Sequence, residues 1–118
     1  MTDRISFRFA TALIFGGQLL FIAAGIFHPG REPANSHPAV FAEYANSAYW
    51  GAVHMGQFAG LTVMLAGFLA LAFALGIQSG SAGWVGRFAA VSAVVTVALA
   101  GVLQAVDGVA LKAARMSG

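Results

Sequence analysis

Long apolar stretches bracketed by polar residues dominate this chain. The clearest lies between Arg87 and Asp107 and contains no charged residue. As an α-helix, rising about 1.5 Å per residue, it would extend about 30 Å, the thickness of the hydrocarbon core of a bilayer. Two further apolar runs have a similar length. The sequence therefore predicts three transmembrane helices, near residues 9–27, 52–75 and 84–111.

Small residues follow one face of the second and third predicted spans. Glycine and alanine allow two helix backbones to approach closely in a membrane. Gly56 and Gly60 form a G-x-x-x-G pattern, whereas the bulky side chains of the same span lie on roughly the other side. We expect six small residues to pack against neighbouring helices: Gly56, Gly60, Gly67, Gly86, Ala93 and Ala100.

The first predicted span carries its polar residues on a single stripe. The positions on this stripe recur at steps of three and four, as in a left-handed helix pair. The stripe is therefore expected to face another helix. Its members are Thr11, Ile14, Gln18, Phe21, Gly25 and His28.

Residues 28–51 form the longest connection between the spans. Ser36 or His37 is suited to cap a helix, and Pro38 suits its first turn. Apolar residues then recur at helical spacing, which predicts a short amphipathic helix near 38–49. It is too short to span a bilayer, and its aromatic residues are typical of the membrane interface.

The link over residues 76–83 is short and rich in glycine and serine. Such a link joins antiparallel neighbours. The predicted fold is therefore an all-α integral membrane protein with an up-down-up bundle and one interfacial helix. Residues 1–118 form a single multi-pass membrane domain, or the first part of a larger bundle.

Composition supports this fold class and excludes several functions. The chain is 59% hydrophobic and 8% charged, whereas soluble domains have about 25% charged residues. The net charge of +2 is spread over both ends and forms no basic patch for nucleic acid. In composition the chain resembles small multi-pass bacterial membrane proteins, a likeness that assigns no functional residue. The expected partners are the lipid bilayer and other membrane helices, in a homo-oligomer or a larger complex.

Three common catalytic motifs are missing from the sequence. It has no P-loop, no H-E-x-x-H and no G-x-S-x-G, and its lack of cysteine excludes thiolate chemistry. Ser92 and Thr96 have no histidine near them on their own helix, and membrane hydroxyls commonly bond to a carbonyl one turn earlier. An enzymatic function is therefore not favoured.

A ring of polar residues is expected at one depth, at the outer ends of the three spans. The functional interpretations are a divalent metal site, haem ligation by His28 and His54, or proton transfer. The structural interpretation is that polar residues lie at helix ends because water and headgroups are there. The ring comprises His28, His54, Gln57, Gln104 and Asp107.

Within this ring we expect His28 to pair with Asp107. His28 closes the polar stripe of the first span, and Asp107 follows Ala100 and Gln104 on one face of the third. The first and third spans run parallel in this topology. A carboxylate near the hydrocarbon edge commonly takes a partner. His54 is expected to face away from the bundle, because it shares a face with bulky residues rather than with the glycines.

Two functional hypotheses follow. The first is a non-catalytic membrane subunit without a cofactor, whose role is helix packing in a larger assembly. The second is a redox, haem-binding, metal-binding or proton-handling protein that uses the polar ring.

The balance of basic residues leads to a testable orientation. Arg4 and Arg8 flank the first span, which predicts a cytoplasmic N-terminus and residues 28–51 outside, although lysine and arginine are evenly divided between the two sides. A single cysteine introduced as Asn35→Cys should be labelled by an impermeant reagent in intact cells. Labelling only after lysis would reverse the orientation.

Overall fold

The computed structural model describes residues 2–30, 33, 35–76 and 79–116 of the chain, and all regular secondary structure in this part is helical. Three helices are long and apolar enough to cross a membrane, over Arg4–Ile26, Trp50–Leu75 and Gly80–Ala114. The all-helical fold with three candidate spans is therefore confirmed. The elements in chain order are α1 (Thr2–Ile26), α2 (His37–Asn46), α3 (Trp50–Leu75), α4 (Gly80–Ala105), the π-helix η1 (Val106–Ala110) and α5 (Leu111–Met116).

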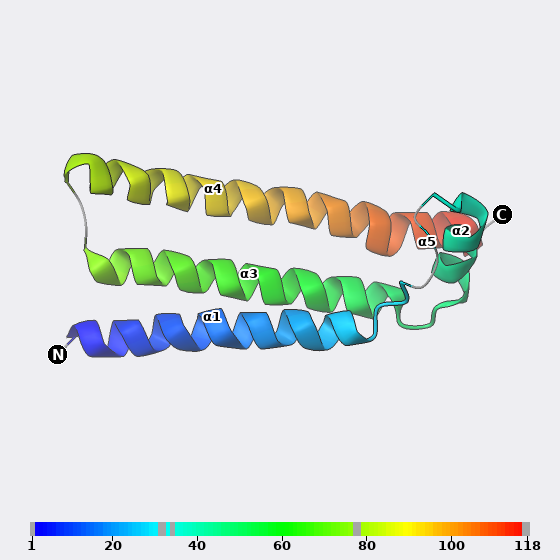
Figure 1. The fold of residues 1–118 in the computed structure, drawn as a ribbon, viewed down its shortest axis with the longest axis horizontal. Helices are drawn as coiled ribbons and strands as arrows, with labels where there is room; N and C mark the ends of the chain where they lie inside the picture. The colour runs from blue at the N-terminus through cyan, green and yellow to red at the C-terminus, as the bar shows by residue number, and fades with distance from the viewer. Residues whose placement is uncertain (1, 31–32, 34, 77–78, 117–118) are drawn as a thin grey trace.

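The three long helices run up, down and up, with α3 between α1 and α4 (Figure 1). The short helix α2 lies at one end, where it packs against α5 (Figure 1). As expected, α2 starts with Ser36 as its N-cap and a proline in its first turn. It ends at Asn46, three residues earlier than predicted, and the next helix already begins at Trp50.

Glycine shapes the turn between α3 and α4. Gly76 and Gly80 have φ values of 62° and 65°, a left-handed conformation that glycine adopts without steric cost. The amide of Gly76 also donates a hydrogen bond to the carbonyl of Phe73, which closes the last turn of α3. Residues 77–78 of the predicted turn lie outside the described residues. α4 begins at Gly80, four residues before the predicted start.

The helices α1 and α3 approach each other closely along their length. A Cβ added to Gly60 would lie 2.5 Å from the amide nitrogen of Phe21, and one added to Gly67 would lie 2.7 Å from that of Ile14. From the other side, a Cβ on Gly17 would lie 2.4 Å from the nitrogen of Met64. At Gly56 the nearest atom is the side-chain Cβ of Ala24, at 2.9 Å. The two backbones can therefore meet only where side chains are absent.

This contact differs from the polar stripe that we expected on α1. The buried positions are Ala10 and Gly17, whereas Thr11 and Gln18 are exposed. In an α-helix consecutive residues are turned by about 100°, so packing centred on Gly17 leaves Gln18 on an outer face. The expectation that the whole stripe contacts a neighbouring helix within the chain is wrong for these two polar residues.

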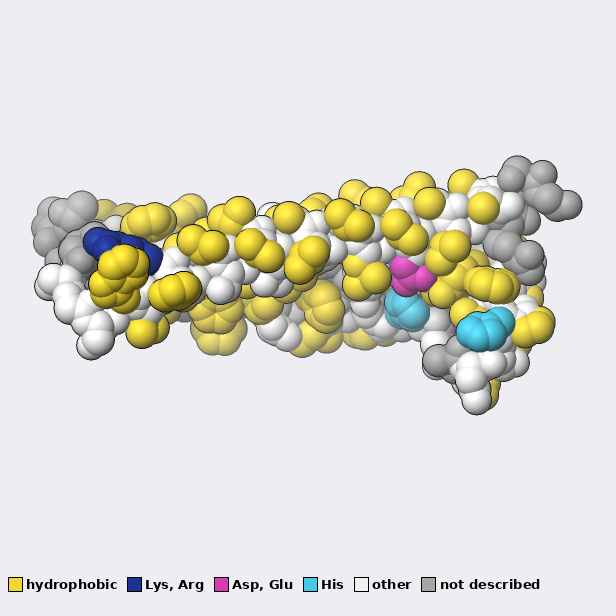
Figure 2. Space-filling view, turned by 90° about the horizontal axis from the view of Figure 1, so that it is seen from above, with side chains coloured by type: hydrophobic (Ala, Val, Ile, Leu, Met, Phe, Trp, Pro, Cys, Tyr) yellow, Lys and Arg dark blue, Asp and Glu magenta, His cyan; other side chains and the backbone are white. Residues whose placement is uncertain are grey.

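The helix α4 packs less closely against α3 than α1 does. Gly83 and Ala93 are its buried residues, and most of its large aliphatic side chains are exposed. Ala100 is half-buried, and a Cβ on Gly86 would meet no atom within 4 Å. The face over α4 is mostly apolar, with charged side chains toward its ends (Figure 2).

The close glycine contact gives a matched pair of substitutions. Gly60→Ala should destabilise the protein by about 1–3 kcal/mol, because the new methyl group overlaps the backbone of α1. Gly16→Ala is the control, since a Cβ there would meet nothing within 4 Å. Thermal unfolding in one detergent measures both, and equal stability of the two variants would contradict this account of the interface.

Candidate functional site

A polar and aromatic cluster lies at the end of the bundle where α3 begins. The side chains of Trp50 and His54 are both about 2% exposed. They are one turn apart on α3, and η1 covers them from the third span. A Cβ on Gly108 would lie 2.5 Å from the Cβ of His54, so only glycine fits at this point of η1. The cluster is therefore buried between α3 and η1.

Both ring nitrogens of His54 have partners within the chain. Nδ1 lies 2.8 Å from the carbonyl oxygen of Trp50, and Nε2 lies 3.2 Å from Oδ2 of Asp107. A carbonyl oxygen only accepts, so Nδ1 carries a proton and donates it. Nε2 and the carboxylate then need a second proton between them, because two bare acceptors would repel. The hydrogen bond between His54 and Asp107 thus contains one shared proton.

Asp107 is held by a second bond from α3. The indole Nε1–H of Trp50 donates to the backbone carbonyl of Asp107 at 2.8 Å. The π-helical turn over Val106–Ala110 contains both the accepting carbonyl and the carboxylate. Extra residues in a turn re-aim side chains, and π-turns occur often at functional positions. Here the π-turn directs the two groups of one residue to two side chains of the neighbouring helix.

Aromatic rings from three segments surround this pair. The ring centroid of Trp50 lies 4.2 Å from that of Tyr44 in α2 and 4.5 Å from that of His54. His28, just after α1, has its centroid 5.1 Å from both Trp50 and His54. Tilted contacts with centroids about 4.5–7 Å apart are typical of stabilising aromatic packing, and the Trp50–Tyr44 contact is slightly closer than this range. The cluster therefore joins α1, α2, α3 and η1.

Tyr44 extends the polar network toward α2. Burial raises the pKa of its phenol, and its hydrogen bond to Asp107 and the negative charges of Asp107 and Glu43 raise this pKa further. The phenol donates its proton to the carboxylate, so loss of that proton would leave two anions side by side. Nearby, Lys112 of α5 donates a hydrogen bond to the carbonyl of Ser47 and fixes the end of α2.

The structure corrects two expectations about the histidines. His54 is buried rather than turned away, because α1 occupies the glycine face of α3 while α4 and η1 cover its bulky face. Asp107 is bonded to His54, and the ring contacts of His28 are with His54 and Trp50. The predicted pairing of His28 with Asp107 is therefore replaced by a His54–Asp107 pair.

The two glutamines of the predicted ring lie apart from this pair. The Nε2 atom of Gln57 faces α1, where it would be 3.5 Å from a Cβ on Gly25. The Oε1 atom of Gln104 is buried and has no hydrogen-bond partner among the described residues. The structure thus brings together three of the five predicted residues.

The hydrogen bonds of His54 affect its ability to bind haem or a metal ion. A haem or metal ligand needs a ring nitrogen whose lone pair points at the metal. Both nitrogens of His54 are already engaged by Trp50 and Asp107. Within the described part of the chain, no group of three or more His, Asp or Glu side chains is arranged to hold a metal ion.

Sequence reasoning did not assign Trp50, Tyr44 or Gly108 to this cluster. It placed Trp50 and Tyr44 in the membrane interface as amphipathic aromatics. The available signals were the four-residue spacing of Trp50 and His54 on one helix face, and a glycine directly after Asp107 inside a helical run.

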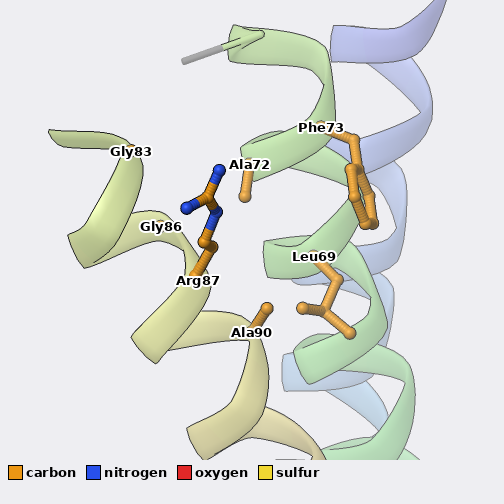
Figure 3. Close-up of a pocket in the computed structure, with 7 residues that line it drawn as sticks. All are labelled: Leu69, Ala72, Phe73, Gly83, Gly86, Arg87 and Ala90. Carbon is orange, nitrogen blue, oxygen red and sulfur yellow. The ribbon is translucent and has the colours of Figure 1, made fainter. Parts of the chain in front are cut away.

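A separate hollow lies between α3 and α4 near the opposite end of the bundle. Arg87 reaches from α4 into the gap between the helices (Figure 3). Its guanidinium carbon is also 5.1 Å from the ring centroid of Trp84, a cation–π contact. Apart from Arg87 the lining is apolar and small: Leu69, Ala72, Phe73, Gly83, Gly86 and Ala90. The hollow presents one cation and no group that would act as a nucleophile or base.

In comparisons with known proteins, no family model, curated protein or solved structure matches the chain.

The His54–Asp107 pair gives a double-mutant test. His54→Gln and Asp107→Asn should each lower the melting temperature, and their effects should be coupled. Polar contacts in membrane proteins have coupling energies of about 0.6 kcal/mol, up to about 1.7. The matched cycle of His28→Gln with Asp107→Asn should show weaker coupling, because His28 contacts the rings of His54 and Trp50 whereas the carboxylate of Asp107 is bonded to His54 itself. Coupling in the His28 cycle alone would restore the pairing that the sequence suggested.

Tyr44 gives a test that depends on pH. Its raised pKa means that the folded chain holds the phenol proton more tightly than the unfolded chain, where tyrosine titrates near about 10. Stability should therefore be unaffected below that pH and should fall as pH rises above it. In a Tyr49→Phe background Tyr44 is the single remaining tyrosine, so ultraviolet absorbance follows its ionisation directly. Asp107→Asn should lower this pKa, and an unchanged titration would contradict the contact.

Proposed function

We propose that this protein is a non-catalytic membrane subunit, which contributes its three helices to a larger membrane assembly. The polar cluster acts in this proposal as a structural clamp that closes one end of the bundle. The observation that supports it best is the full engagement of His54. Both of its ring nitrogens are used by groups of the same chain, which leaves neither directed at a substrate or cofactor.

The exposure of the helices also supports an assembly role. Only about a tenth of the most apolar part of the first and second candidate spans is buried, and the third span is still more exposed. Three helices in a row enclose little interior, because only α3 has neighbours on two sides. Lipid covers the bulky aliphatic surface, whereas exposed polar and small residues favour contact with further helices.

The test uses the protein in patches of its native membrane, extracted without detergent. The mass of the particle should exceed that of one copy, and the absorption spectrum should contain no Soret band. Single copies of the chain, alone in their lipid patches, would overturn the proposal. A Soret band or a stoichiometric metal would overturn it as well.

One observation favours proton handling as a second candidate function. Tyr44, Asp107 and His54 form a continuous hydrogen-bonded series from α2 to the interior of the α3–η1 contact. Such series carry protons when they connect to further acceptors. Liposomes with an internal pH dye provide the test. Proton flux that is lost in His54→Gln and kept in His37→Gln, a substitution at an exposed residue of α2, would favour this function over the clamp.

A further inference from the structure

Gln18 is the polar side chain that the fold leaves in the least favourable place. It lies midway between Arg8 and His28, so about 15 Å of helix separates it from each. This places it near the centre of the hydrocarbon core. It is exposed, and within the described residues its amide makes no side-chain hydrogen bond. An amide in hydrocarbon without a partner is costly, and such groups normally face another helix.

The helix α3 does not supply this partner. It contacts α1 through the face that contains Ala10 and Gly17, both buried. Gln18 is turned from Gly17 by about 100°. The helix α4 lies on another side of α3 (Figure 1). The amide therefore points to a surface that no other helix of the described chain covers.

The residues around Gln18 have the spacing of a helix–helix seam. Thr11, Phe15, Gln18 and Ile22 are separated by steps of four, three and four, and all of them are exposed. Thr11 and Gln18 are one heptad apart, which is the repeat of a left-handed helix pair. We call these four residues the α1 outer face.

We propose that a second copy of this chain packs on the α1 outer face, with the two Gln18 side chains hydrogen-bonded to each other. This proposal rests on the proposed assembly function and names the partner. A carboxamide carries both donors and an acceptor, so two glutamines related by a two-fold axis satisfy each other in both directions. Copies inserted with the same orientation run parallel, and Thr11 then meets Thr11 on the same axis. Lipid tails offer no hydrogen bond at this depth, and headgroups lie about 15 Å away.

The test measures self-association in liposomes by energy transfer between labelled copies. The chain has no cysteine, so Asn35→Cys gives one labelling site away from the α1 outer face. Adding lipid dilutes the labelled copies in the membrane, and the lipid-to-protein ratio at which energy transfer falls by half measures the strength of association. Gln18→Leu should weaken association about tenfold, whereas Gln18→Asn keeps the self-complementary amide and should stay close to wild type. Gln18→Leu should fold normally, because the amide makes no side-chain bond within its own chain, and its melting temperature checks this.

Cysteine crosslinking locates the contact. Phe15→Cys should form disulfide-linked dimers under mild oxidation, and Val91→Cys on the exposed surface of α4 should not. The proposal fails if wild-type copies show no energy transfer, if Gln18→Leu associates as tightly as wild type, or if only Val91→Cys crosslinks. Patches of native membrane distinguish failure of the dimer proposal from failure of the proposed assembly function. If a patch contains one copy of the chain together with a different membrane protein, the dimer proposal is overturned and the assembly function is not.

Discussion

The close approach of the α1 and α3 backbones is the constraint on which the rest of the structure depends. Gly17, Gly60 and Gly67 lie where any Cβ would overlap the facing helix. In lipid there is no hydrophobic force between helices, so packing of this kind provides the attraction. Once α1 occupies the glycine face of α3, the face that carries His54 and Phe58 is left for the third span. A Cβ on Gly101 of α4 would lie 3.4 Å from the ring of Phe58, which shows how that second contact is made.

The polar cluster follows from this arrangement. His54 is forced into the contact between α3 and η1, where an unpartnered imidazole would be costly. The π-turn supplies the partner, because it brings the carboxylate of Asp107 to Nε2 and its carbonyl to the indole of Trp50. Tyr44 bonds to the same carboxylate from α2. One residue of the third span thus joins two other helices, and a proton held between His54 and Asp107 keeps the site compatible with its burial.

The sequence was sufficient for the number and order of the three long helices and for the position of the short one, because apolar runs and helix starts are local properties, whereas the helix bounds differ by several residues. Pro38 and Ser36 located the start of α2, and the apolar runs located the spans. The rotation of each helix about its axis was less predictable. A helical wheel divides α3 into a small face and a bulky face, but it does not show that both are internal, and this is why His54 was misplaced. Asp107 could not be placed either, since the π-turn at residues 106–110 shifts the register on which any wheel depends.

Two glutamines show how depth in the membrane decides which polar group requires assembly. Gln104 is one helical turn from Asp107, near the end of its span, where water and headgroups are close. Its Oε1 atom is buried within the chain and is therefore not exposed to lipid. Gln18 is at the centre of its span, where the surrounding lipid offers neither donor nor acceptor. The same side chain is thus tolerable at one depth without a second protein and costly at the other. In this arrangement α3 packs on the glycine face of α1 and α4 packs on α3, so Gln18 stays exposed. The proposed pairing of two copies therefore rests on the unmet hydrogen bonds of one central amide, and not on the large apolar surface around it, which lipid alone can cover.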